Sequence, residues 1–376
     1  MIAKRQAIFG LQATAPQRRA CLAPGKAAAL ARPPTVAMAA SQQQQQQQSQ
    51  PLVASRANSV SEWIETNLGS KVTKGGGVGG GSGWSSATIY TVEDGRQFFV
   101  KTARGMEALP MFTGEALGLQ AMYDTHTIRI PKVYGFGELD GPGLKPSAFI
   151  VMEALNIRGR ADQAELGRRM AQMHLATPKD EKAAAGYFGF PVTNTIGGTV
   201  QPNPWTKDWV EFFREHRLGH MLRLAEVSDN ITLYQRWPVH TPELESCRSG
   251  ATCRISRGVN PSFHHQNSIS GHLLYQIGVL HGDVWSGNVS AADGEPCIFD
   301  PATYYGHHEA EWGMAWCCSL GPAFWQEYHK IIPKEPGWEE RHQLYLLYHF
   351  LNHYVLFGSS YKYECVSIME SLVAKL

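Results

Sequence analysis

The chain has 376 residues, of which 43% are hydrophobic and 18% are charged, and its formal net charge at neutral pH is +1. A chain of this length and composition can bury a sizeable core and divide into two lobes. It contains no run of 18 apolar residues, so we expect no membrane-spanning helix. Residues 1–50 include basic but no acidic residues, so the rest of the chain is slightly acidic. That balance argues against a nucleic-acid partner.

Residues 1–55 are predicted to form a leader. The segment is rich in Ala, Gln, Arg and Pro, and the first acidic residue of the chain is Glu62. This composition is typical of an organelle transit peptide, and the alternative is a disordered tail without a targeting signal. The glutamine run, residues 42–48, has no apolar surface to bury and is predicted to be disordered.

The sequence pattern of residues 56–155 predicts a small lobe built mainly from strands. Asp94-Gly95 is a strong turn signal between two strand-like runs. Ahead of these runs, residues 74–83 form a glycine-rich segment that matches neither a P-loop nor the G-x-G-x-x-G pattern. The predicted helices cover residues 61–68 and 112–123, and the predicted strands cover residues 87–91, 97–102, 131–137 and 148–155.

The sequence pattern of residues 156–376 predicts a larger, mainly helical lobe. Asp162 and Glu165 form a capping box that opens a helix. His174, near the end of that helix, is expected to be a structural hydrogen-bonding residue and not a catalyst. Further helices are predicted over residues 205–225, 311–330, 338–357 and 359–376.

The segment 235–271 departs from this helical pattern. It has almost no apolar periodicity and is rich in Ser, Arg, His, Asn and Pro. Its composition cannot offset the conformational entropy that ordering would cost, so we predict an exposed and poorly ordered segment. It is either a real insertion or the product of a wrong gene model.

The stretch 280–306 contains a motif for phosphoryl transfer. His281, Asp283 and Asn288 fit the spacing H-x-D-x-x-x-x-N, which is the catalytic loop of kinases. Phosphoryl transfer needs a carboxylate that accepts the proton of the attacking hydroxyl group, and oxygen ligands that hold Mg²⁺ against the phosphates. We therefore predict Asp283 as the catalytic base.

A second carboxylate completes the motif. A short buried strand is predicted over residues 296–299, and it ends at Asp300. The turn Asp293-Gly294 lets the chain double back and bring Asp300 beside Asn288. Asn288 and Asp300 are the predicted Mg²⁺ ligands, and with Asp283 they form the predicted catalytic set.

These motifs resemble those of one family closely. The run LHGDVWSGNV, followed by IFDPATYYGHHEAEWGMAW, is similar to the fructosamine-3-kinase (ketosamine-3-kinase) family of protein-kinase-like small-molecule kinases. The resemblance extends over about residues 60–376. It implies an α+β fold with two lobes: a small N-lobe, residues 56–155, with an antiparallel sheet and one helix, and a mainly helical C-lobe, residues 156–376.

The resemblance also implies an activity. The family phosphorylates the 3-hydroxyl group of ketoamines on protein lysines or free amines, with ATP and Mg²⁺, and this leads to deglycation. The implied partners are ATP and glycated amines or proteins, with a monomer or homodimer as the assembly. Because plant and algal members commonly carry plastid leaders, the chloroplast (plastid stroma) is the expected location, with mitochondrion or cytoplasm as alternatives.

Further residues acquire roles by the same resemblance. Lys101 corresponds to the kinase lysine that grips the α- and β-phosphates, and Glu115 corresponds to its partner. The family has a cysteine at the position of Ser82, so no thiol switch is expected there. The other implied nucleotide contacts are Gly79, Gly80, Gly81 and Ser82 at the phosphates, and the backbone of Met152, Glu153, Ala154 and Leu155 at the adenine.

The sugar site is less constrained by the sequence. Trp285 and Tyr304 or Tyr305 are candidates for stacking on the sugar, although burial of the two tyrosines in the lobe core is equally compatible with the sequence. Residues 187–191 and 194–197 resemble a family loop near that site. Two alternative functions are a small-molecule kinase of the aminoglycoside or choline kinase type and a catalytically impaired binding module.

Overall fold

The computed structural model describes residues 52–78, 85–140, 145–229 and 275–375. The elements given below all belong to one compact unit, Val53–Leu376. Three predictions lie outside the described residues: the leader up to residue 51, the glycine-rich residues 79–82, and the segment 235–271. Among the described helices, none has the length and apolar character that a membrane crossing requires.

A six-stranded sheet forms the N-lobe, with the strand order β1-β5-β6-β4-β3-β2. β1 runs parallel to β5, and the other neighbouring strands are antiparallel. Four of the strands were predicted, but β1 is short and β2 ends in three glycines, so neither shows a clear strand pattern. The strands are β1 (Ser55–Ala57), β2 (Val72–Gly77), β3 (Ser86–Val92), β4 (Gln97–Arg104), β5 (Val133–Leu139) and β6 (Ser147–Glu153).

Helix α2 (Val60–Leu68) packs against this sheet and begins one residue earlier than predicted. The Ser59 side chain accepts a hydrogen bond from the Glu62 backbone N–H, which caps the first turn. The apolar side of the helix, with Trp63 and Ile64, joins a buried cluster whose other members are Val60, Val92, Phe98, Val100, Phe149 and Val151.

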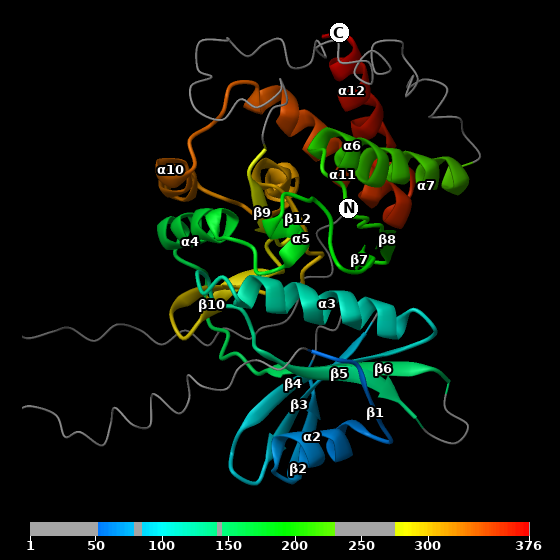
Figure 1. The fold of residues 1–376 in the computed structure, drawn as a ribbon, viewed down its shortest axis with the longest axis vertical. Coiled ribbons are helices and arrows are strands. Elements are labelled where there is room, and N and C mark those ends of the chain that lie inside the picture. The colour runs from blue at the N-terminus through cyan, green and yellow to red at the C-terminus, as the bar shows by residue number, and fades with distance from the viewer. Residues whose placement is uncertain (1–51, 79–84, 141–144, 230–274, 376) are drawn as a thin grey trace, which may run out of the picture. The chain divides into compact units, whose positions relative to one another are not determined.

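Helix α3 (Ala108–Tyr123) lies between the sheet and the C-lobe (Figure 1). It contacts β5 and β6 on one side and β7 on the other, and most of its circumference is therefore buried. Gly114 and Gly118 allow the close approach, because a Cβ atom at Gly114 would lie 2.5 Å from Cβ of Asn194. The helix begins four residues before the predicted one.

The C-lobe begins after β6 and is mainly helical, as predicted. Its first helix, α4 (Gln163–Leu175), is capped by Asp162, whose side chain accepts from the Glu165 backbone N–H. The other elements up to residue 229 are α5 (Glu181–Ala184), β7 (Asn194–Ile196), β8 (Thr199–Gln201), α6 (Trp209–Phe213), the π-helix η1 (Arg214–Leu218) and α7 (Gly219–Asp229).

Two pairs of short strands and a group of helices complete the lobe. β9 pairs with β12, and β10 pairs with β11, both antiparallel. The elements from residue 277 onward are β9 (Ile277–Leu280), β10 (Val289–Ala292), β11 (Glu295–Ile298), β12 (Tyr304–His307), the 3₁₀ helix η4 (His308–Cys317), α10 (Pro322–Ile331), α11 (Trp338–Phe357), the 3₁₀ helix η5 (Ser359–Tyr361) and α12 (Lys362–Val373).

Three predicted helices of the C-lobe differ from the structure, and one of them, predicted over residues 359–376, opens as the 3₁₀ helix η5 and continues as α12. The helix predicted over residues 205–225 begins only at Trp209, because Asp208 caps it and the segment before it is extended. The helix predicted over residues 311–330 is two elements, since η4 ends at Cys317 and Pro322 starts α10. The spacing of apolar residues does not distinguish a 3₁₀ helix from an α-helix over so few turns.

Candidate active site

The two strand pairs of the C-lobe position the predicted catalytic residues. β9 ends at Leu280, so the segment 281–288, which we call the catalytic loop, starts directly at a strand end. β10 and β11 are joined by Asp293 and Gly294, which have φ angles of 51° and 87°. This turn reverses the chain as predicted, and the Phe299 N–H then donates to the backbone oxygen of Asn288 over 3.2 Å.

Asn288 joins the two aspartates of the motif. Its side-chain nitrogen Nδ2 donates to the backbone oxygen of Asp283 over 3.0 Å and to Oδ2 of Asp283 over 3.3 Å. The same nitrogen lies 3.1 Å from the backbone oxygen of Asp300. The amide therefore joins the catalytic loop to the segment that follows β11, and the three residues of the predicted catalytic set lie together.

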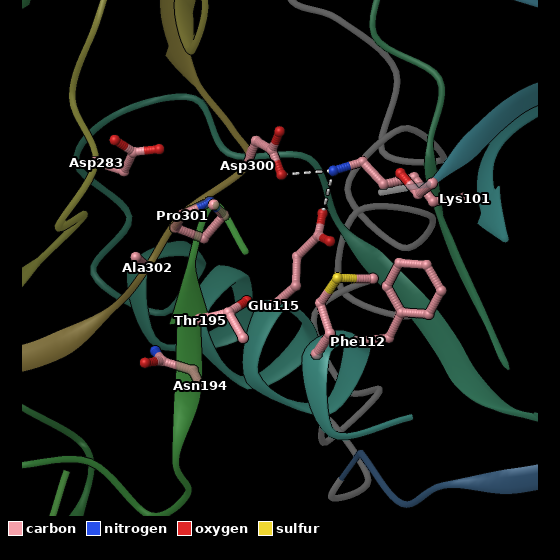
Figure 2. A pocket seen from close by; sticks show the side chains of 12 residues that line it. Lys101, Phe112, Glu115, Asn194, Thr195, Asp283, Asp300, Pro301 and Ala302 are labelled. Carbon is pink, nitrogen blue, oxygen red and sulfur yellow. Dashed lines mark hydrogen bonds and ion pairs between the residues drawn. The ribbon is translucent and has the colours of Figure 1, made fainter. Parts of the chain in front are cut away.

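Lys101 connects the N-lobe to this set (Figure 2). Its ammonium nitrogen lies 2.7 Å from Glu115 of α3 and 2.6 Å from Asp300. The predicted pair of Lys101 and Glu115 is thus confirmed, whereas the contact with Asp300 was not predicted. The negative charges of both partners outweigh burial and raise the pKa of Lys101, which keeps the side chain charged.

Burial and charge also act on Asp283. Its side chain is partly buried. Burial, together with the negative charges of Asp300 and Glu311, raises the pKa of Asp283 to about 7. A carboxylate with a pKa in this range is a stronger proton acceptor than an exposed aspartate.

An open pocket lies in front of these residues, with about 570 Å³ of empty space when the solvent at its mouth is included. Figure 2 shows that the labelled side chains come from both lobes. The predicted loop 194–197 contributes Thr195 and Gly197, and Met111 and Phe112 of α3 complete a wall that the sequence reasoning missed. The lining residues are Ser85, Lys101, Met111, Phe112, Glu115, Asn194, Thr195, Gly197, Asp283, Asp300, Pro301 and Ala302.

The predicted adenine contacts lie at the exit from the sheet. β6 ends at Glu153, and the residues after it lead into the C-lobe. The Glu153 N–H already donates to the backbone oxygen of Lys132 over 2.8 Å, and the Glu153 carboxylate pairs with Arg129. Glu153 therefore has its backbone donor engaged within the protein.

The three candidate sugar contacts differ in exposure. The Trp285 side chain is 39% exposed and lies over Gly287, where a Cβ atom would come within 2.3 Å of the indole ring. Tyr304 and Tyr305 are buried, so the structure agrees with burial in the lobe core and not with stacking on a sugar. The Arg217 guanidinium lies 4.0 Å from the centre of the Tyr304 ring and covers one face of the ring.

Asn288 and Asp300 suit Mg²⁺ by the chemistry of their donor atoms. The hydrogen bonds of Asn288 given above use Nδ2, so in the described part of the chain its carbonyl oxygen Oδ1 is not engaged. The Asp300 side chain is 46% exposed, and Lys101 contacts its Oδ1. An amide oxygen and a carboxylate are the hard ligands that Mg²⁺ prefers.

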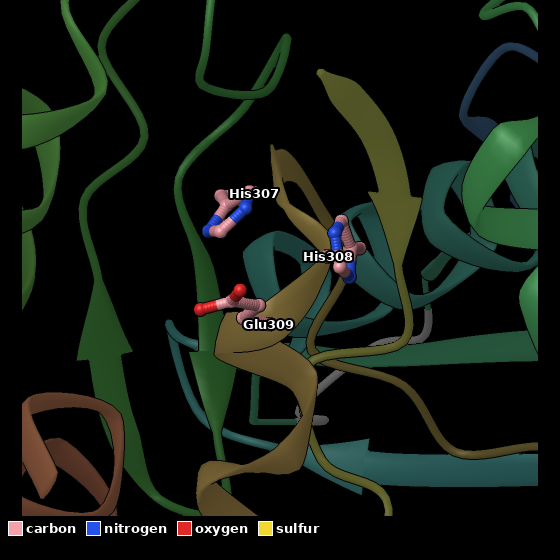
Figure 3. A group of neighbouring side chains, drawn as sticks. All are labelled: His307, His308 and Glu309. Carbon is pink, nitrogen blue, oxygen red and sulfur yellow. The ribbon is translucent and has the colours of Figure 1, made fainter. Parts of the chain in front are cut away.

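A second group with metal-ligand chemistry is buried elsewhere in the C-lobe. His307, His308 and Glu309 lie close together (Figure 3). Nδ1 of His307 is 3.0 Å from the hydroxyl of Tyr345, and Arg341 binds both oxygens of the Glu309 carboxylate. Protein side chains thus already engage this group.

Fold and site together are those of a phosphotransferase with the protein-kinase-like fold. A crystal structure of a candidate fructosamine-3-kinase from Thermobifida fusca matches this chain with a TM-score of 0.64 and 25% identity, over 85% of this chain and 99% of that one. Residues 56–375 match the family model described as fructosamine kinase, and the chain belongs to this family.

Relatives over most of the chain agree with this assignment. The chain is 42% identical over 329 residues to the chloroplastic protein-ribulosamine 3-kinase of Arabidopsis thaliana, which corresponds to 86% of this chain and 90% of the relative. It is 32% identical over 333 residues to the ketosamine-3-kinase of Mus musculus, or 82% of this chain and 98% of the relative. The protein is therefore a kinase.

Proposed function

We propose that the protein phosphorylates the 3-hydroxyl group of ketoamines, the sugar adducts of protein lysines and free amines, with ATP as the phosphate donor. The observation that carries this proposal is the assembly of Lys101, Asp283 and Asp300 around one pocket, with Asn288 joining the two aspartates, in a chain of the fructosamine kinase family. The names of the relatives from Arabidopsis and mouse support the ketoamine as acceptor.

Asp283 acts as the general base in this reaction. The oxygen of the sugar hydroxyl attacks the γ-phosphorus, the bond from that phosphorus to the ADP oxygen breaks, and the hydroxyl proton passes to Asp283. Asn288 fixes the carboxylate through the contact of 3.3 Å to Oδ2. The product is a ketoamine 3-phosphate, from which phosphate leaves more readily than hydroxide would, so that the adduct breaks down and the amine is released.

The charged groups of the pocket bind the donor nucleotide. Lys101 binds the α- and β-phosphates, and Glu115 orients the lysine from α3. Mg²⁺, held by Asn288 and Asp300, would neutralise charge on the phosphates. Gly79–Ser82 and the segment Met152–Leu155 are the proposed contacts to the phosphates and the adenine. Trp285 remains the proposed contact to the sugar because its side chain is exposed within the catalytic loop.

Two variants test the roles of the carboxylates. Asp283→Asn should lower kcat about 100- to 10,000-fold with little change in KM for ATP, since a general base acts on the chemical step. Asp300→Asn should abolish most turnover. Glu370→Gln replaces an exposed carboxylate and serves as the control. Wild-type kcat in Asp300→Asn would show that Asp300 is not a ligand.

The choice of acceptor needs a separate assay. ATP consumption is measured with ribulosyl-lysine, fructosyl-lysine and an aminoglycoside, each with the purified wild-type protein. Turnover with a ketoamine supports the proposal. Turnover with the aminoglycoside alone would replace it with the alternative kinase type, and no turnover with any of the three would favour a binding module.

The proposed location is the plastid, and residues 1–55 are the proposed transit peptide. The relative from Arabidopsis is named as chloroplastic, and so is the relative from Oryza sativa subsp. indica, which is 43% identical over 328 residues. The acid-free, Arg- and Ala-rich composition of the leader supports the same location.

A further inference from the structure

The backbone at the start of the catalytic loop is held by side chains. The N–H groups of His281 and Gly282 donate to the two carboxylate oxygens of Glu311, over 2.7 Å and 2.8 Å. The next N–H group, that of Asp283, donates to Nδ1 of the His281 ring over 3.2 Å. Side chains therefore receive all three donors, and two of the three depend on Glu311, so the position of Asp283 depends in part on what fixes Glu311.

Glu311 belongs to η4, far along the chain from the catalytic loop, and its side chain is 1% exposed. Burial alone would raise the pKa of this carboxyl group, but the hydrogen bonds from the His174 ring and from the N–H of Gly282 outweigh burial and lower it. The group is therefore an ionised acceptor that receives two backbone donors at once, in short, charge-assisted hydrogen bonds.

A chain of buried groups orients this carboxylate. Nε2 of His174 lies 3.3 Å from Oε2 of Glu311, and Nδ1 of the same ring lies 2.9 Å from the hydroxyl of Tyr328. That hydroxyl also lies 3.2 Å from Nδ1 of His308. A neutral His174 that donates from Nε2–H to Glu311 accepts at Nδ1 from the Tyr328 hydroxyl, which in turn accepts from Nδ1–H of His308, and we assign the protons in this way.

From this geometry we infer that Glu311, oriented by His174, is a positioning residue that sets the backbone of the catalytic loop and so the place of Asp283. The inference rests on the proposed role of Asp283 as the base. Glu311 touches neither nucleotide nor sugar in this scheme, and its effect on the reaction passes through two backbone N–H groups. A general base must reach the hydroxyl within hydrogen-bond distance, so a small shift of the loop lowers the rate steeply.

The substitution Glu311→Gln tests the need for two acceptor oxygens. A glutamine of the same shape keeps one acceptor but turns an NH₂ group toward a backbone N–H, so one hydrogen bond is replaced by a contact between two donors. We expect kcat to fall on the order of 100-fold, while KM for ATP changes less than about 2-fold.

Glu309 provides a matched control on the same 3₁₀ helix. It is 2% exposed, and its carboxylate pairs with Arg341 of α11 (Figure 3 shows Glu309 beside His307 and His308). Glu309→Gln removes a buried charge from a similar position and should destabilise the fold, because Arg341 loses its partner. It should leave kcat of the folded enzyme within about 3-fold of wild type.

Hydrogen exchange distinguishes a local loosening of the catalytic loop from a general loss of stability. In Glu311→Gln the amides of the peptide containing His281 and Gly282 should exchange faster while those of β4 and α3 keep their protection. In Glu309→Gln any acceleration should be shared by the whole C-lobe. Equal effects of the two variants on kcat, or unchanged exchange of the loop amides in Glu311→Gln, would overturn the inference.

Two variants of His174 keep the test valid if Glu311→Gln does not fold. His174→Gln retains an N–H donor near the position of Nε2, whereas His174→Ala removes it. The glutamine variant should keep more of kcat than the alanine variant, and its loop amides should exchange more slowly than those of the alanine variant. The opposite order would contradict the role of His174.

Asp283→Asn separates this inference from the proposed function, because it should lose kcat without faster exchange of the loop amides. If Asp283→Asn kept its activity, the proposed base would be wrong, although the exchange data would still report whether Glu311 holds the loop.

Discussion

Replacing His308 with asparagine should make the protein less sensitive to acid. His308 is buried, and burial together with the positive charges around it lowers the pKa of this imidazole from an ordinary value near 6.5 to about 3. The groups that face it are His174 of α4, Tyr328 and His329 of α10, Arg341 of α11 and the adjoining His307 and Glu309.

The direction in which the free energy of unfolding changes with pH follows from proton binding. The folded pKa lies below the unfolded pKa, so between these values the unfolded chain binds a proton at this residue and the folded chain does not. The free energy of unfolding therefore falls as the pH falls below about 6.5. From about pH 7.5 to pH 5.5 this one residue should remove about 1.4 kcal/mol, a sizeable share of the 5–15 kcal/mol that stabilises typical domains.

Comparison with a variant isolates the contribution of His308. Other groups titrate in the same range, among them Asp283 with its raised pKa and the buried His349, whose pKa is lowered to about 3. These contributions are common to wild type and His308→Asn, so they cancel in the difference between the two proteins. Asparagine can still donate to the Tyr328 hydroxyl, which limits the damage to the buried chain of hydrogen bonds.

The assay is urea unfolding followed by tryptophan fluorescence at the two pH values. The wild type should lose about 1.4 kcal/mol more than His308→Asn on going to the lower pH. If both proteins lose the same free energy, His308 is not a buried neutral imidazole, and the reasoning is refuted.

Two further predictions concern α3 and the leader. Gly114→Ala should destabilise the protein by about 1–3 kcal/mol and lower kcat/KM, because its Cβ would lie 2.5 Å from Asn194 and push α3, with Glu115, away from Lys101. Gly321→Ala, where the nearest atom is 3.9 Å away, is the control in denaturation and kinetic assays, and an equal loss in both variants would contradict this account. A fusion of residues 1–55 to a fluorescent protein should enter plastids, and a diffuse cytosolic signal would remove the transit-peptide prediction.

Local features of the fold could be predicted because their signals lie within a few residues of each other. The cap at Asp162 needs only the Glu165 backbone N–H three residues on, and the turn at Asp293-Gly294 needs only two residues that tolerate positive φ. The spacing of Asp283 and Asn288 is likewise local. The sequence alone therefore indicated the catalytic set, the helices with clear apolar stripes and, through the family resemblance, the two-lobed α+β fold.

The tertiary structure decided the contacts between segments distant in the chain. Lys101 and Asp300 are 199 positions apart, and Glu311 lies about 30 positions from the backbone it holds. Tyr304 stands next to the motif, yet whether it faces a sugar or the core depends on Arg217, which comes from the distant π-helix η1 and covers its ring. Burial and long-range hydrogen bonding depend on which elements pack together, and no local pattern of residues carries that information.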